Sequence, residues 1–404
     1  MAILPRRARH RLILTLMKTV ATFMPGASYM AFAGSGSAGQ LCRYIGQTGI
    51  GRLLVVTDRP LRELGLVDRA TAELATAGVE TAVFDGVEPD PTFGQVRAGV
   101  AAWREHGAEA VLAVGGGSSI DAAKIIAAAA TGDRDPRDWV GFAKIKHDVP
   151  PIYVIPTTSG TGSEATIGSV LSDDETHEKA VISARQLLPA AVALDPDLLL
   201  GLPQPITAAT GLDALTHAVE AYICEWDRGT ARQHAAAAVK LIFRHLETAY
   251  RDGSDREARE GMALAAYYAG IAINQVNVGN VHAIAHQLGG RYGIPHGLAN
   301  SLVLPHVLEF TFAETRPRLA ELAELAGVAD EGAGEEANAR AFIAAVRDLK
   351  KAVALPETSE KIRAEDYDYL CELALKECEA YPVPRMLDRE GTLEILKNIS
   401  TDTG

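Results

Sequence analysis

Two groups of side chains in the second half of this 404-residue chain have types and spacings that could bind a metal ion. Asp213 and His217 are four residues apart in GLDALTHAVE, and His282 and His286 are four apart in VHAIAHQ. On a helix this spacing places both members of a pair on one face. A carboxylate with imidazoles suits a borderline divalent ion such as Fe²⁺ or Zn²⁺ and leaves a position for a substrate oxygen.

A third nearby histidine, His296, can join the others only if the chain turns back. Fourteen residues of unbroken helix would carry it roughly 21 Å from His282. The intervening segment has three glycines within residues 289–293 and then Pro295, which interrupt helices and permit a return. Because a lone histidine on an apolar helix face is usually a core residue, the metal-site hypothesis depends on the whole set.

Two glycine-rich segments in the first half predict a site for phosphate. AVLAVGGGSSIDAAK (residues 110–124) indicates a strand, a glycine turn and a helix, and PTTSGTGSEAT (156–166) follows the next apolar run. Glycines let a ligand approach backbone N–H groups, and a helix N-terminus attracts anions. Ser118 and Asp121 also resemble a capping box, so a plain turn is the alternative. The GxGxxG fingerprint is absent, but two such loops favour a phosphate-bearing cofactor.

Asp58 ends an apolar run in the motif VVTD. There a carboxylate can accept hydrogen bonds from a ribose diol and repel a 2′-phosphate, which favours NAD over NADP. The alternative is that Asp58 caps a helix beginning near Pro60.

Two kinds of structure must position these residues. From residue 52 to about 195, β-branched runs alternate with helical stretches, as in βαβ units on a parallel sheet. We expect strands at 52–57, 81–85, 110–115 and 151–156 and crossover helices such as 62–77 and 93–105. In the second half of the chain, apolar residues recur at helical spacing. We predict a Rossmann-like α/β domain over residues 1–200, including an N-terminal leader helix, and an all-α metal-binding domain over 201–404.

Composition limits the partners and the location. The net charge of -13 repels nucleic acid and anionic lipid, and no apolar run approaches the roughly 20 residues that span a bilayer. We therefore expect neither a nucleic-acid nor a membrane partner. The N-terminal RRARHRLILTLMKTVATFMPG leaves a targeting signal as the alternative to a leader helix. Four scattered cysteines without a CxxC pair favour the cytoplasm.

The ordered motifs GGGSSID, PTTSGTGSE, GLDALTHAVE and VHAIAHQLGGRYGIPHG resemble those of the iron-containing (group III) alcohol dehydrogenase family. The resemblance runs from VVTD through FDGVEPDPT to YPVPRML and covers nearly the whole chain. It implies the dehydroquinate synthase-like architecture of that family, with a dinucleotide-binding α/β domain, a helical domain and an active site in the cleft between them.

The resemblance also implies residue roles. The metal ligands it implies are Asp213, His217, His282 and His296, and it places His286 beside the substrate and nicotinamide. The cofactor residues it implies are Gly116, Gly117, Ser118 and Asp121 at the pyrophosphate, Thr157, Thr158 and Thr161 near the adenine and ribose, Lys179 near the nicotinamide ribose, and Asp58 on the adenosine ribose. The family's EPNPT reads EPDPT here, so Asp90 lacks the amide donor of the usual asparagine.

We therefore expect an NAD-dependent alcohol dehydrogenase that uses a divalent ion, Fe²⁺ first, with Zn²⁺ or Mn²⁺ as alternatives. The ion would lower the pKa of the alcohol, hydride would pass to the nicotinamide, and His286 would relay the proton or serve only in packing. The apolar setting of the histidines favours a small primary alcohol and its aldehyde. A diol, glycerol or a hydroxy acid is the alternative substrate, and family habit favours a homodimer or larger homo-oligomer.

Three other functions fit less well. A lyase resembling 3-dehydroquinate synthase needs several basic residues for its anionic substrate, and Arg291 is the main one near the histidines. A maleylacetate reductase-like enzyme lacks the metal, whereas all four ligand types occur here. A non-catalytic NAD-binding sensor is supported by no DNA-binding module or interaction tail.

Overall fold

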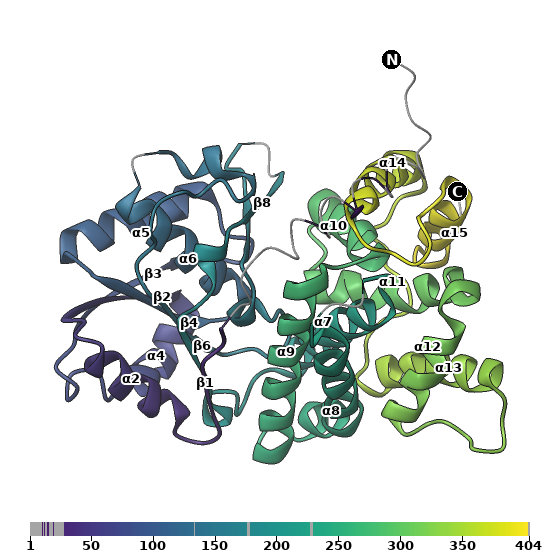
Figure 1. Cartoon of the computed structure of the whole chain (residues 1–404), viewed down its shortest axis with the longest axis horizontal. Coiled ribbons are helices and arrows are strands. Elements are labelled where there is room, and N and C mark those ends of the chain that lie inside the picture. The colour runs from purple at the N-terminus through teal and green to yellow at the C-terminus, as the bar shows by residue number, and fades with distance from the viewer. Residues whose placement is uncertain are drawn as a thin grey trace.

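The computed structural model describes residues 10, 12, 14, 15 and 19 and the ranges 28–132, 134–175, 178–226 and 229–402. Every named strand lies before residue 195, and helices make up the rest, so that Figure 1 shows a sheet-containing half beside a helical half. This arrangement confirms the predicted fold class.

The larger sheet is parallel and has six strands in the order β1-β9-β6-β4-β2-β3. Its strands are β1 (Ala31–Ala33), β2 (Arg52–Asp58), β3 (Glu80–Val87), β4 (Ala110–Gly115), β6 (Ile152–Pro156) and β9 (Ala191–Leu194). β4 is buried along its whole length, which explains its continuous apolar run.

Helices cover both faces of this sheet. Alternate residues of β2 point to opposite sides: Leu54 and Val56 pack in the core beneath α5 (Phe93–His106) and α6 (Gly117–Thr131). Leu53 and Val55 pack beneath α2 (Ser37–Gln47). Because β4 and β6 pair in parallel, their carboxyl ends reach the same edge of the sheet, where both glycine-rich loops begin.

Three parts of the first half differ from the prediction. A short strand, β1, precedes the expected first strand and pairs with β9. The expected helix at 62–77 is wrong in its extent: Gly65 adopts the left-handed region (φ 69°) and separates α3 (Arg59–Glu63) from α4 (Leu66–Thr71). A second, three-stranded sheet was not foreseen, and it contains β5 (Gly141–Phe142), β7 (Gly168–Ser172) and β8 (Lys179–Ser183).

In the described part of the chain no strand follows β9. The helices there are α7 (Gln204–Ile223), α8 (Ala231–Arg251), α9 (Arg256–Val276), α10 (Asn280–Tyr292), α11 (His296–Phe310), α12 (Phe312–Ala326), α13 (Glu335–Ala352), α14 (Tyr367–Glu377) and α15 (Arg389–Asn398). Among the described residues, no helix combines the length and apolar character needed to cross a bilayer.

The predicted leader helix at residues 6–26 lies mostly outside the described residues. Of those that are described, His10 is buried with Nε2 2.9 Å from the carbonyl oxygen of Tyr381. Leu14 is buried in the core of the helical half.

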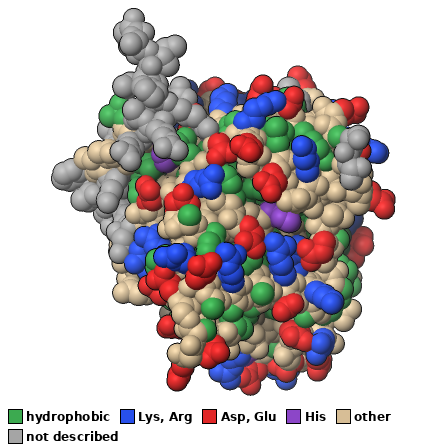
Figure 2. Space-filling view, turned by 90° about the vertical axis from the view of Figure 1, so that its right-hand side faces the viewer, with side chains coloured by type: hydrophobic (Ala, Val, Ile, Leu, Met, Phe, Trp, Pro, Cys, Tyr) green, Lys and Arg blue, Asp and Glu red, His purple; other side chains and the backbone are tan. Residues whose placement is uncertain are grey.

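The surface carries charges of both signs. On the face shown in Figure 2, basic and acidic side chains are interspersed over the helical half.

Candidate active site

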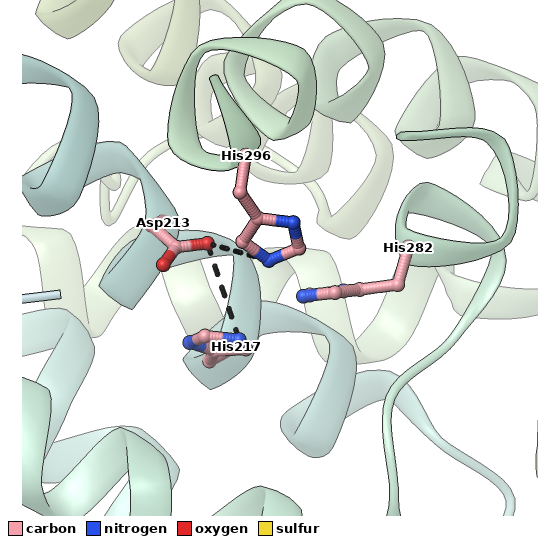
Figure 3. Close-up of side chains that lie close together, drawn as sticks. All are labelled: Asp213, His217, His282 and His296. Carbon is pink, nitrogen blue, oxygen red and sulfur yellow. Dashed lines mark ion pairs between the residues drawn. The ribbon is translucent and has the colours of Figure 1, made fainter. Parts of the chain in front are cut away.

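Four donor side chains from three helices meet in the helical half. α7 supplies Asp213 and His217, α10 supplies His282, and α11 supplies His296. One potential ligand atom from each lies within 4.8 Å of all the others. In Figure 3 the carboxylate of Asp213 and the three rings point toward one common space. The Nε2 of His296 is 3.4 Å and that of His217 is 4.0 Å from Asp213 Oδ1.

A chain reversal between α10 and α11 makes this convergence possible. Gly293 ends α10 in the left-handed region with φ 61°, where a side chain would be strained. Pro295 then precedes the first residue of α11, His296. The glycine and proline signals thus mark the break that carries His296 back to His282.

Three of the four donors are buried. Asp213, His217 and His282 are at most 4% exposed, whereas the side chain of His296 is 41% exposed and leaves an open side. Burial, then repulsion by the neighbouring histidines, holds the pKa of His282 well below its usual value. Desolvation around the ring, above all, lowers the pKa of His296 to about 4. Neutral imidazoles with free lone pairs are the form that binds a metal, so the donor set fits a divalent ion.

Glu220 holds one ligand in its orientation. Its Oε2 lies 2.6 Å from Nδ1 of His282, and the carboxylate also accepts hydrogen bonds from the backbone N–H groups of Gly279 and Val281, at 2.8 and 2.6 Å. A proton on Nδ1 leaves Nε2 of His282 for the metal. Burial raises the pKa of Glu220 to about 7. Glu220 was not predicted from the sequence, although it lies two helical turns after Asp213 within the motif GLDALTHAVE.

His286 lies beside the donor set instead of in it. Its ring stacks on His296 with centroids 5.4 Å apart, and its Nδ1 is 2.6 Å from Oε1 of Glu377. Glu377 also accepts hydrogen bonds from Tyr381 Oη and Gln287 Nε2, each at 2.6 Å. Although burial raises the pKa of Glu377, these hydrogen bonds bring it below its usual value. Glu377 was not predicted from the sequence, because it is 91 residues from His286 and lies in no motif.

The two glycine-rich loops lie against each other. A β-carbon on Gly117 would come within 2.8 Å of the side chain of Thr161, and one on Gly116 within 3.3 Å of Thr158. No described side chain caps α6, so the predicted capping box of Ser118 is wrong. The uncapped N-terminus of α6 presents N–H groups that suit an anion.

Asp121 has a different role from a cap. Its carboxylate accepts hydrogen bonds from Ser163 Oγ and, at 2.9 Å, from the backbone N–H of Val170. The Nζ of Lys124, which is fully buried, donates to the carbonyl oxygens of Ser163 and Gly168 at 2.7 and 2.6 Å. These bonds tie the second glycine loop and β7 to α6.

The second glycine loop also contacts two helices of the helical half, α7, which carries two of the metal donors, and α9. A β-carbon on Gly160 would lie 2.5 Å from the side chain of Thr210, which is one turn before Asp213 on α7. Gly162, with φ 62°, leaves room for the backbone of Gly270 on α9. Thr157 is buried at the start of this loop, after β6. The loop predicted to bind phosphate thus contacts α7 one helical turn before the metal donor Asp213.

The remaining predicted residues lie at the ends of strands. Asp58 ends β2 and caps α3 by accepting a hydrogen bond from the N–H of Leu61 at 2.9 Å, as the capping alternative predicted. Lys179 at the start of β8 forms an ion pair with Asp90 and also donates to Ser172 Oγ at 3.1 Å. Asp90 has φ 58°, a region that asparagine and aspartate tolerate better than other side chains. The positive charge of Lys179 also contributes to lowering the pKa of His296.

Comparisons with known proteins match both halves of the chain to one family. The model described as iron-containing alcohol dehydrogenase matches residues 30–196, and the one described as Fe-containing alcohol dehydrogenase family, C-terminal, matches residues 207–400. The 1,3-propanediol dehydrogenase of Citrobacter freundii is 39% identical over 363 residues, covering 89% of this chain and 93% of that protein.

Two further matches are as extensive. The NAD-dependent methanol dehydrogenase of Bacillus methanolicus is 34% identical over 378 residues, covering 93% of this chain and 98% of that protein. A solved structure of an alcohol dehydrogenase from Oenococcus oeni matches with a TM-score of 0.88 and 33% identity, covering 92% of this chain and 100% of that chain.

Proposed function

Because the chain belongs to the iron-containing alcohol dehydrogenase family, a family of oxidoreductases, we propose that it interconverts a small primary alcohol and its aldehyde, using NAD and a divalent ion. The observation that carries the proposal is that four metal donors meet close to the second glycine loop. That loop follows the carboxyl end of a parallel strand and contacts α7 one helical turn before Asp213. Ligands of open α/β sheets bind at such strand ends.

The residues that would hold the ion are Asp213, His217, His282 and His296. A bound divalent ion supplies a Lewis acid that lowers the pKa of an alcohol, and NAD supplies the hydride acceptor. We propose Fe²⁺, in keeping with the iron named in both family descriptions. Zn²⁺ and Mn²⁺ are the alternatives, because the same ligands bind each of them.

His286 is the side chain we propose to carry the alcohol's proton away. Glu377 engages its Nδ1, so Nε2 is the nitrogen left to exchange a proton. The anionic partner also stabilises the imidazolium that forms when His286 accepts that proton.

For the cofactor we propose the arrangement implied by the motifs. Gly116, Gly117 and Ser118 would contact the pyrophosphate, while Asp121 shapes the site by holding the second loop. Thr157, Thr158 and Thr161 would lie near the adenine and ribose, Asp58 would bind the adenosine ribose, and Lys179 with Asp90 would lie near the nicotinamide ribose. The relative named NAD-dependent methanol dehydrogenase supports NAD as the cofactor.

The names of the relatives support a small alcohol as the substrate. Methanol and 1,3-propanediol are both small primary alcohols, and the latter keeps a diol as the alternative to a monohydric alcohol. Glycerol or a hydroxy acid is the remaining alternative. We further propose a division into domains at residue 201, with 1–200 binding the dinucleotide and 201–404 the metal, and a cytoplasmic homodimer or larger homo-oligomer.

An assay of the purified enzyme tests this function. The metal-stripped protein receives Fe²⁺, Zn²⁺ or Mn²⁺ in turn and is mixed with NAD or NADP and a panel of methanol, ethanol, propanol, 1,3-propanediol, glycerol and lactate. We expect NADH formation with the uncharged primary alcohols only after an ion is restored. Equal rates without any ion, or no oxidation of any of these compounds, would contradict the proposal.

A further inference from the structure

Asn300 contacts three of the four metal donors from a position that no motif indicates. It lies one turn after His296 on α11 and is fully buried. Its side-chain nitrogen, Nδ2, is 2.7 Å from Asp213 Oδ1 and 3.2 Å from Nε2 of both His282 and His296. One amide nitrogen thus links α7, α10 and α11 at the point where the donors meet.

The orientation of this amide follows from its surroundings. If it were reversed, its oxygen would face Asp213 Oδ1 at the 2.7 Å of the present contact, and two acceptors would oppose each other. In the orientation observed, Oδ1 of Asn300 is buried and has no hydrogen-bond partner among the described residues. The contact with the charged carboxylate therefore determines the orientation, at the expense of the other end of the amide.

The two N–H groups of Asn300 serve different purposes. The shorter bond commits one N–H to Asp213. The other N–H can serve the two imidazole nitrogens only while their lone pairs are free, that is, until an ion takes them. The bond to Asp213 persists, because a carboxylate oxygen can accept a hydrogen bond and still bind a metal.

We propose that Asn300 is a positioning residue of the metal centre. Through Nδ2 it holds the carboxylate of Asp213 in its metal-binding orientation, and without the ion it keeps His282 and His296 in place. The inference rests on the proposed function, since it concerns the same metal site. His217 lacks such support: its Nδ1 is buried and has no partner among the described residues, and its ring stacks on that of His282 with centroids 4.7 Å apart.

A metal titration tests the role of Asn300. The metal-free, full-length protein is titrated with Co²⁺, without NAD, as wild type, Asn300→Ala and Asn300→Ser. The side chains of both variants are too short to reach Asp213, so we expect the dissociation constant for Co²⁺ to rise about 10- to 100-fold. Ser301→Ala is the matched control, because it removes the hydroxyl of a neighbouring buried side chain, which donates a hydrogen bond to the helix carbonyl of Leu298. Its Co²⁺ affinity should equal that of the wild type.

The visible spectrum of bound Co²⁺ separates positioning from ligation. If Asn300 only positions Asp213, Co²⁺ at saturation has the same coordination number in the variants as in the wild type. A change of coordination number would overturn the proposal by showing that the amide oxygen is itself a ligand. Unchanged Co²⁺ affinity in both variants would overturn it as well. Failure of the wild type to bind Co²⁺ would instead overturn the proposed function, and the inference with it.

Discussion

Glu220 and His282 are 62 residues apart in the chain, yet Oε2 of the one lies 2.6 Å from Nδ1 of the other. Glu220 also accepts hydrogen bonds from the first turn of α10 and from the residue before it, through the N–H groups of Val281 and Gly279. A single carboxylate therefore orients both the helix that carries this metal donor and the donor itself.

Substitution of Glu220 should weaken the metal site more than the fold. Glu220→Gln removes the charge that keeps the proton on Nδ1 of His282, and loss of such an outer carboxylate typically costs about 10- to 100-fold in metal affinity. We expect that loss in a metal titration followed by calorimetry. The control is Glu321→Gln, whose carboxylate accepts a hydrogen bond from Tyr222 Oη at 2.7 Å. Equal affinities in the two variants would show that Glu220 does not act on the ligand.

Glu377→Gln tests the proton path at His286. The neutral amide stabilises the protonated imidazole less, so kcat should fall by about tenfold while KM and metal content stay near those of the wild type. Steady-state kinetics and elemental analysis measure the two effects. Tyr381→Phe removes a different hydrogen bond to the same carboxylate and should reduce kcat less. A rise in KM alone would indicate that Glu377 acts in substrate binding.

Asp58→Asn should relax the preference for NAD over NADP. The substitution removes the charge that would repel a 2′-phosphate, whereas asparagine remains a good N-cap for α3. We expect kcat/KM for NADP relative to NAD to rise by about tenfold with little loss of stability. Asp68→Asn, at an exposed position on the neighbouring helix α4, is the control and should leave the ratio unchanged. No change in the ratio for Asp58→Asn would place the adenosine ribose elsewhere.

Acid should destabilise α11 through His306. Burial, then repulsion by Arg347 and Lys350, lowers the pKa of His306 to about 4. Below the usual histidine pKa of about 6.5, His306 is protonated in the unfolded chain but stays neutral in the folded chain. The free energy of unfolding therefore falls as the pH drops from about 6.5 to 4, by up to about 1.4 kcal/mol per pH unit. Urea unfolding at several pH values measures this fall. His306→Gln should make it shallower, and an identical fall in both proteins would refute the assignment.

The sequence predicted the parts of this molecule that local spacing determines. Three features leave a periodic or glycine signal in the sequence. They are the i, i+4 pairs on α7 and α10, the break at Gly293 and Pro295, and the strands of the larger sheet that have continuous apolar runs. Short elements leave none: β1 has three residues and β5 has two, and both depend on a neighbouring strand.

The supporting side chains of the site could not be predicted in the same way. Glu377 reaches His286 only because α14 packs against α10, and Asn300 reaches three donors only after three helices have met. Such contacts are set by tertiary packing, which spacing along one helix does not encode. Glu220 lies between these two cases. Its position two turns after Asp213 could have predicted that it lies on the same helix face, but not which residue it contacts.

The most direct test of the metal-dependent mechanism is the metal content and alcohol-dependent NADH formation of His282→Ala, measured beside the wild type purified without chelator. We expect one divalent ion per wild-type chain, neither ion nor activity in the variant, and the same far-ultraviolet circular dichroism spectrum for both proteins. Full activity of His282→Ala without a bound ion would contradict the metal-dependent mechanism.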